Sequence, residues 1–239
     1  MTVTWEELGW ERLAAGVGRC RLPGWDCTVG LVVGDGSALM IDAGSSLAEG
    51  ARLRTEAQAL AGRRVPLLLL THPHFDHVFG AAAFAGATVF AAGGARKVFE
   101  HGAEELRADA VRNGLAPGAA ENAADTLVRP REYVYGPTLL ELDGGPEVQL
   151  VATRGHTAHD LAVLVPGSPA VVFCGDLVEE SGEPQAGPDA VPSHWPAALD
   201  RLLDLGGEDA VYVPGHGAVV DAGFVRAQRD ALATRFGVS

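Results

Sequence analysis

The sequence predicts a layered α/β fold in a single domain that spans residues 1–239. Segments with the composition of strands alternate with segments of helical periodicity, as expected when helices pack against a sheet. No repeat, low-complexity tract or linker-like stretch divides the 239 residues. Single domains of this length are common among layered α/β proteins.

The first quarter of the chain is predicted to contain two strands and one helix. Residues 29–33 and 38–41 are apolar segments that a tight turn at residues 34–36 can join. A helix then begins at Ser45 or Ser46, whose side chains can cap it. Its apolar stripe ends near Ala61, and Gly62 can terminate it.

The next segments continue the alternation as far as residue 113. Residues 65–70 form a continuous apolar run, which is typical of a strand buried on both faces. Hydrophobic periodicity then predicts helical turns at 78–84, a strand at 87–92 and a surface helix at 95–113. Residues 114–137 carry three prolines yet are more apolar than a free linker needs, so they are a candidate lid over a site.

The second half of the chain is predicted to contain four more strands. Two of them pair across the turn Pro166-Gly167-Ser168-Pro169. A helix with apolar residues at Leu199, Leu202 and Leu203 opens near His194. The four predicted strands are residues 148–152, 161–165, 170–174 and 210–213.

The run Thr71-His72-Pro73-His74-Phe75-Asp76-His77 places three imidazoles and a carboxylate directly after the predicted strand at 65–70. These residue types at this spacing suit a site for first-row metal ions. The alternative is a solvated histidine-rich loop. It is disfavoured because clustered imidazoles repel one another when protonated, and because such a loop need not follow a buried strand.

Three further donors stand just past predicted strand ends. They are His156 after the strand at 148–152, Asp176 after 170–174, and His216 after 210–213. Taken singly, a histidine is usually structural and a Gly-Asp pair is usually a turn. Their shared placement favours one common site.

In order and spacing these motifs resemble those of the metallo-β-lactamase-fold hydrolases. The motifs are the His72/His74/Asp76/His77 run, Gly155-His156-Thr157, Gly175-Asp176 and Pro214-Gly215-His216-Gly217. Residues 40–44 also resemble the Asp-x-Gly turn of that family. The resemblance implies a four-layer αββα sandwich, in which two mixed β-sheets carry helices outside and a metal cleft lies at one edge.

The resemblance also implies a role for each donor. His72, His74 and His156 would hold one divalent ion, and a second ion would be held by Asp76, His77 and His216. Asp176 would bridge the two. Asp42 would orient a ligating imidazole rather than bind metal itself. Two ions about 3.5–4 Å apart can share a hydroxide that forms at neutral pH.

The expected function is therefore that of a dinuclear metal hydrolase that cleaves a small ester, thioester, lactone or amide. The expected cofactors are two Zn²⁺ ions, with iron or manganese as alternatives, and Asp76 would pass a proton to the leaving group. The bridging aspartate and the full four-donor run resemble the glyoxalase II and lactonase branches more than the lactamases. A mononuclear iron oxygenase, similar to the persulfide dioxygenases, and a non-catalytic metal-binding sensor are the alternatives.

Missing features disfavour particular relatives. Only 23 residues follow His216, too few for the helical substrate domain of glyoxalase II. The tyrosine that acyl-homoserine lactonases carry after the bridging aspartate is replaced here by Leu177-Val178-Glu179-Glu180. The Gly-Arg-Thr segment typical of persulfide dioxygenases does not occur between Asp176 and Pro192.

Charge and composition bound the partners and the location. The formal net charge of −13 disfavours nucleic acids and anionic membranes. The N-terminal residues lack a signal sequence, no run is long enough to span a membrane, and the three cysteines form no disulfide framework. We therefore expect a cytoplasmic protein that acts on a small molecule, and monomer and dimer both fit.

Three other histidines are candidates for lesser roles. His159 is expected at the rim of the site or in a structural position. His194 lies at the start of a helix, where a pocket edge is plausible. His101 falls among glutamates on a predicted surface helix and is assigned no function.

Overall fold

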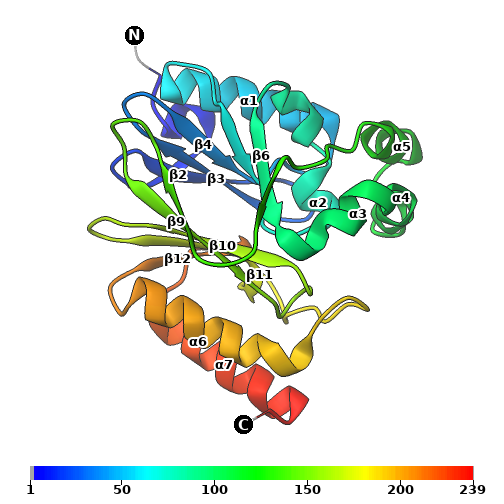
Figure 1. Cartoon of the computed structure of the whole chain (residues 1–239), viewed down its shortest axis with the longest axis vertical. Helices are drawn as coiled ribbons and strands as arrows, with labels where there is room; N and C mark the ends of the chain where they lie inside the picture. The colour runs from blue at the N-terminus through cyan, green and yellow to red at the C-terminus, as the bar shows by residue number, and fades with distance from the viewer. Residues whose placement is uncertain (1–2, 239) are drawn as a thin grey trace.

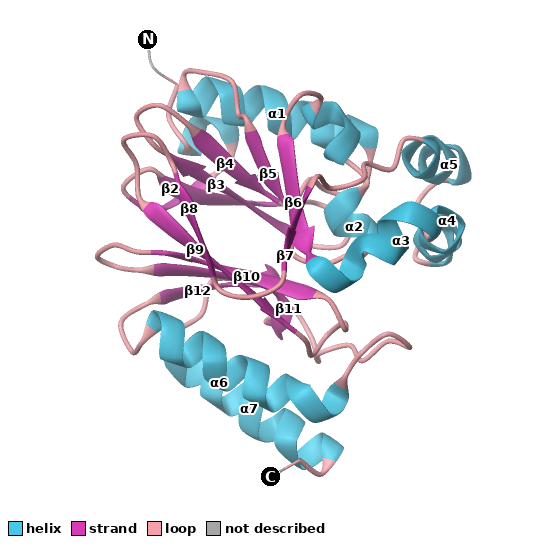
Figure 2. Ribbon diagram, in the orientation of Figure 1, coloured by secondary structure: helices cyan, strands magenta, loops and turns pink. Residues whose placement is uncertain are grey.

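Two β-sheets pack face to face in the computed structural model, and helices cover both outer faces (Figure 1). The structure describes residues 3–238. Met1 and Thr2, which belong to the N-terminal segment predicted to lack a signal sequence, therefore lie outside it. The four layers are helix, sheet, sheet and helix (Figure 2). The αββα sandwich implied by the sequence resemblance is therefore confirmed.

The first sheet contains seven strands in chain order. Its first four strands pair antiparallel, and from β4 onward neighbouring strands are parallel. The carboxyl ends of β4, β5 and β6 therefore meet at one edge of the sheet. The strands are β1 (Glu11–Ala14), β2 (Val17–Arg21), β3 (Thr28–Val33), β4 (Ala38–Ile41), β5 (Leu67–Leu69), β6 (Thr88–Ala92) and β7 (Glu132–Val134).

The second sheet has five strands in the order β12-β11-β10-β9-β8. Strands β8 to β11 pair antiparallel, and β12 lies parallel to β11. The predicted pairing of the strands around the turn at 166–169 is confirmed. The strands are β8 (Thr138–Glu141), β9 (Glu147–Thr153), β10 (Asp160–Val165), β11 (Val171–Glu179) and β12 (Val211–His216).

Helices α1 to α5 lie over the first sheet, and α6 and α7 lie over the second (Figure 1). Three apolar layers match this arrangement: one between the first helices and their sheet, one between the sheets, and one beneath α6 and α7. No helix among residues 3–238 is long and apolar enough to cross a bilayer. The helices are α1 (Leu47–Ala61), α2 (Phe75–Val78), α3 (Arg96–His101), α4 (Ala103–Arg112), α5 (Pro117–Asp125), α6 (Trp195–Gly206) and α7 (Ala222–Phe236).

Helix α1 begins and ends as the sequence predicts. The Ser46 hydroxyl accepts a hydrogen bond from the Glu49 backbone N–H at 3.3 Å, and Gly62 ends the helix with φ of 65°. Gly50 lets α1 approach the chain that follows α2, because a Cβ at this position would lie 2.1 Å from the Gly80 carbonyl oxygen. This contact holds α1 close to the segment that carries the histidine-rich run.

Two expectations for residues 95–137 are wrong. The single helix predicted for 95–113 is divided at Gly102 into α3 and α4, because glycine weakens a helix interior. Residues 114–137 do not form a lid. Their alanines Ala120 and Ala123 are buried in the core under the first helical layer, and the segment supplies helix α5 and strand β7.

Candidate metal centre

Five imidazoles and two carboxylates converge where the strand ends of both sheets meet, and we call them the donor cluster. The structure brings together every donor that the sequence predicts. The β5–α2 loop, helix α2, the β9–β10 loop, β11 and β12 supply them. The donor cluster consists of His72, His74, Asp76, His77, His156, Asp176 and His216.

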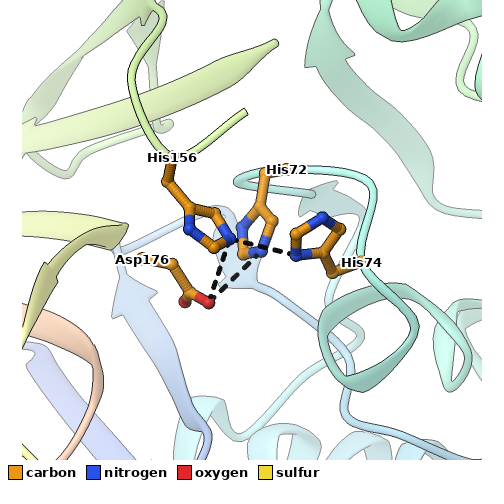
Figure 3. Close-up of side chains that lie close together, drawn as sticks. All are labelled: His72, His74, His156 and Asp176. Atoms are coloured by element: carbon orange, nitrogen blue, oxygen red, sulfur yellow. Dashed lines mark hydrogen bonds and ion pairs between the residues drawn. The ribbon is translucent and has the colours of Figure 1, made fainter. Parts of the chain in front are cut away.

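Asp176 is the hub of the donor cluster. Its Oδ2 lies 3.5 Å from His72 Nε2, 3.4 Å from His156 Nε2 and 3.3 Å from His216 Nε2. Its Oδ1 lies 3.1 Å from His77 Nε2. Figure 3 shows it facing His72, His74 and His156. Asp176 therefore belongs both to a group with His72, His74 and His156 and to a group with His77 and His216.

The position of Asp176 corrects the sequence prediction. Instead of following a strand end, it lies inside β11, which continues to Glu179. The register between β11 and β12 shifts on either side of Gly175, whose φ is +54°. Such irregularities redirect a side chain from a strand interior. A Cβ at Gly175 would also press on Thr71 at 3.0 Å.

Asp42 fixes the proton positions on two imidazoles. Its Oδ2 lies 2.8 Å from His77 Nδ1 and accepts the Thr71 hydroxyl at 2.7 Å, and its Oδ1 accepts the Thr71 backbone N–H at 2.8 Å. A carboxylate only accepts, so His77 carries its proton on Nδ1. Because the Thr71 hydroxyl donates to Asp42, it accepts from His72 Nδ1 at 3.0 Å. The expected contact between Asp42 and a cluster imidazole is confirmed.

Acceptors outside the cluster fix the other three imidazoles in the same way. His156 Nδ1 donates to the Gln185 carbonyl at 3.0 Å, and His216 Nδ1 donates to the Trp25 carbonyl at 2.7 Å. His74 Nε2 donates to the Asp189 carboxylate at 3.0 Å. Each imidazole therefore directs an unprotonated nitrogen toward the centre, through Nδ1 in His74 and through Nε2 in the other four.

These inward lone pairs face one another without protons between them. His156 Nε2 and His74 Nδ1 are 3.0 Å apart, although both are acceptors in this tautomer assignment. His72 Nε2 and Asp176 Oδ1 are buried without any hydrogen-bond partner among the described residues. In this tautomer assignment, a cation between the buried lone pairs would satisfy them. A set of imidazole and carboxylate donors fits divalent ions such as zinc, iron or manganese.

The electrostatics favour positive charge at the same point. Burial alone would raise the pKa of the Asp176 carboxyl, but the surrounding imidazoles, above all His216, hold it well below its usual range. Burial lowers the pKa of His216, yet the Asp176 carboxylate outweighs this effect and raises it to about 10. For His156 the effect of burial is the largest, and it lowers the pKa of the imidazole to about 4. Protons or metal ions can supply the charge that the cluster stabilises.

A cavity of about 320 Å³ opens over the donor cluster. His74, Asp76 and His216 are among its lining residues, and none comes from residues 114–137. The lining residues outside the cluster are Trp25, Phe75, Asp109, Asn113, Glu179, Ser181, Gly182, Glu183, Gln185 and Gly187.

The remaining histidines lie away from this cavity. His159 lines a separate cavity of about 330 Å³ and packs on Gly94, so it does not lie at the rim of the cluster cavity and fits the expected structural position instead. His194 is exposed and does not line the cluster cavity, so a pocket-edge role is not supported. His101 is exposed on α3, as expected.

Sequence reasoning missed Asp189 and Cys27. Asp189 lies in the irregular loop between β11 and α6, where no pattern singles it out. Cys27 is buried with its Sγ 3.7 Å from both ring nitrogens of His77. Its proximity to the cluster arises from an isolated bridge with His216, which only the three-dimensional pairing reveals.

Comparison with known proteins identifies the family of the chain. The family model of the metallo-beta-lactamase superfamily matches residues 22–216. Metallo-beta-lactamase domain-containing protein 1 of Xenopus laevis is 28% identical over 80% of this chain and 71% of its own length. Hydroxyacylglutathione hydrolase of Acidiphilium cryptum is 26% identical over 82% of this chain and 67% of its own length.

Solved structures agree on the fold. The metallo-beta-lactamase FIM-1 from Pseudomonas aeruginosa, in its mono-zinc form, superposes with a TM-score of 0.72 at 18% identity and covers 96% of both chains. A metallo-beta-lactamase from Pontibacter korlensis gives a TM-score of 0.68 at 21% identity, over 93% of this chain and 97% of its own. The family match covers most of the sequence and includes all seven donors, so the chain belongs to the metallo-beta-lactamase superfamily, whose members are generally metal-dependent hydrolases.

Proposed function

We propose that this protein is a dinuclear metal-dependent hydrolase that cleaves a small ester, thioester, lactone or amide. One observation carries the proposal: each of the five imidazoles gives its outer nitrogen to a fixed acceptor and turns its other nitrogen toward Asp76 or Asp176. A site with its tautomers fixed in this way is preorganised for cations. The relative named hydroxyacylglutathione hydrolase supports hydrolytic chemistry.

The donors divide into two sets around Asp176. We assign His72, His74 and His156 to one ion, Asp76, His77 and His216 to the other, and Asp176 to both. The nitrogen and oxygen donors suit Zn²⁺, with iron or manganese as alternatives. When bound, two such ions lower the pKa of a shared water to provide a nucleophile and polarise a substrate carbonyl.

The side chains of the protein position the substrate and move protons. Asp76 lines the cavity floor, with its Oδ2 3.4 Å from His216 Nε2. We assign it the transfer of a proton to the leaving group. Trp25 and Phe75 contribute an apolar wall that orients the substrate above the donors and excludes water.

Hydrolysis of a substrate panel tests this function. Protein loaded with Zn²⁺ is assayed on ester, thioester, lactone and amide substrates, together with the Asp176→Ala variant. We expect turnover of at least one class, and a loss of about 100-fold or more in Asp176→Ala. His101→Ala, which removes an exposed imidazole, is the matched control and should keep full activity. Undiminished activity in Asp176→Ala would refute the bridged arrangement.

Several expectations from the sequence stay predictions. They are a single domain over residues 1–239, a cytoplasmic location and the absence of a nucleic-acid partner. The net charge of −13 supports the last of these.

A further inference from the structure

The cavity over the donor cluster is lined by acidic side chains and by no basic ones. Outside the cluster itself, the charged residues in its wall are Asp109, Glu179 and Glu183. No lysine or arginine is among the described residues that line it. A pocket that bound a substrate carboxylate would be expected to supply such a cation.

Two of these carboxylates have no neutralising partner. Glu179 accepts the Ser181 hydroxyl at 2.8 Å, and neither Glu179 nor Glu183 forms an ion pair with any residue in the range 3–238. Asp109 differs, because Arg112 pairs with it at 2.8 Å. The uncompensated negative charge in the wall therefore resides on Glu179 and Glu183.

Aromatic surface in the same wall suits an organic cation. The rings of Trp25 and Phe75 meet edge to face, with centroids 5.3 Å apart, and both line the cavity. An alkylammonium group binds well where an aromatic ring and a carboxylate are both within reach. The guanidinium of Arg154 lines the separate cavity with His159.

We propose that this pocket selects substrates that carry a positively charged group, such as an alkylammonium, beyond the scissile bond, and that Glu179 is the main specificity-determining residue. The proposal rests on the proposed hydrolase function. It extends that function by assigning the charge class of the substrate. The protein-wide charge of −13 favours the same class by attracting cations to the surface.

Three matched esters test the selection. They are 4-nitrophenyl esters whose acyl chains end in trimethylammonium, in the isosteric tert-butyl group, or in carboxylate. Assays of the Zn²⁺-loaded protein run at pH 8. We expect kcat/KM for the cationic ester to exceed that of the neutral one about tenfold, and that of the anionic one about 100-fold. Equal rates, or faster cleavage of the anionic ester, would overturn the proposal.

Variants assign the effect to one side chain. Glu179→Gln keeps the size of the side chain and its hydrogen-bonding capacity, so it should reduce the preference for the cationic ester over the neutral ester to about threefold or less. Glu141→Gln, on strand β8 and away from the cavity lining, removes the same charge and is the control. A preference that is unchanged in Glu179→Gln would refute the role of Glu179.

A binding experiment separates this proposal from the hydrolase function. Calorimetric titration of the metal-free protein with phenyltrimethylammonium should show binding that Glu179→Gln weakens about fivefold or more. Absence of cleavage of all three esters would contradict the hydrolase function for esters, whereas the titration would still decide the charge preference. No binding of the cation to the wild-type protein would overturn the charge preference directly.

Discussion

Replacing Asp42 by asparagine should move the proton of His77 from Nδ1 to Nε2 and selectively weaken the binding of one metal ion. Asp42 is only 1% exposed, and its φ of +61° is a conformation that asparagine also tolerates. Asparagine keeps an acceptor for the Thr71 backbone N–H. It places an amide NH₂ where Oδ2 now faces His77 Nδ1 at 2.8 Å.

The tautomer change follows from this mismatch. An NH₂ donor facing Nδ1 favours the His77 tautomer with the proton on Nε2, which then points at Asp176 Oδ1, 3.1 Å away. His77 would lose the lone pair that we assign to the second ion. Loss of such an outer partner typically costs about 10–100-fold in metal affinity. Loss of charged hydrogen bonds to Asp42 should also cost about 2–3 kcal/mol in the free energy of unfolding.

Zinc titration in competition with a chromophoric chelator measures both affinities. We expect one ion to bind about 10–100-fold more weakly in Asp42→Asn, and the other to stay within about threefold of its wild-type affinity. Asp204→Asn, at an exposed position on α6, is the control for loss of a negative charge. Two unchanged affinities in Asp42→Asn would refute the assignment of the His77 proton to Nδ1.

Three other substitutions test separate parts of the structure. Asp189→Asn should weaken the binding of the other ion, the one assigned to His74, by less than about tenfold, because the Asp189 side chain is 47% exposed. A larger effect on the affinity for the second ion would contradict the division of donors. Asp160→Asn tests a buried carboxyl whose pKa burial raises to about 7. Because this value exceeds the unfolded value of about 3.9, the wild type should lose stability relative to the variant as pH rises from about 4 to 7. A difference in the free energy of urea unfolding between the two proteins that stays constant over this range would exclude this. Gly50→Ala should destabilise the fold by about 1–3 kcal/mol although alanine favours helices, since its Cβ would meet the Gly80 carbonyl at 2.1 Å; a raised melting temperature would contradict this contact.

The donors themselves could be predicted from the sequence because each follows a strongly apolar run, although β11 continues past Asp176 to Glu179. A run such as Leu67–Leu70 predicts a buried strand, and a polar residue that follows such a strand is expected at the edge of the sheet. Helix α1 was equally predictable, since Ser46 and Gly62 give local signals at both of its ends. In these segments local chemistry and tertiary structure agree.

The partners that orient the donors could not be predicted. The carbonyl groups of Trp25 and Gln185 accept from His216 and His156, and no side-chain pattern encodes a backbone acceptor. Asp189 lies in an irregular loop, where no periodicity restricts its position. Their roles depend on the packing of segments more than 25 residues apart.

The lid expectation was wrong for a related reason. Prolines in residues 114–137 suggested an irregular loop, but Pro117 occupies the first turn of α5, where it does not disrupt the helix. The alanines that follow are small enough to pack closely in the core. Composition alone did not distinguish a buried, alanine-rich helix from a mobile cover.

Metal content tests the central claim most directly. Protein purified without added metal or chelator, and analysed by elemental mass spectrometry, should contain close to two divalent ions per chain, predominantly zinc. Asp176→Ala purified in parallel should contain about one or fewer. About one iron per chain in the wild type, unchanged in Asp176→Ala, would contradict the dinuclear hydrolase and direct the search to oxygen chemistry.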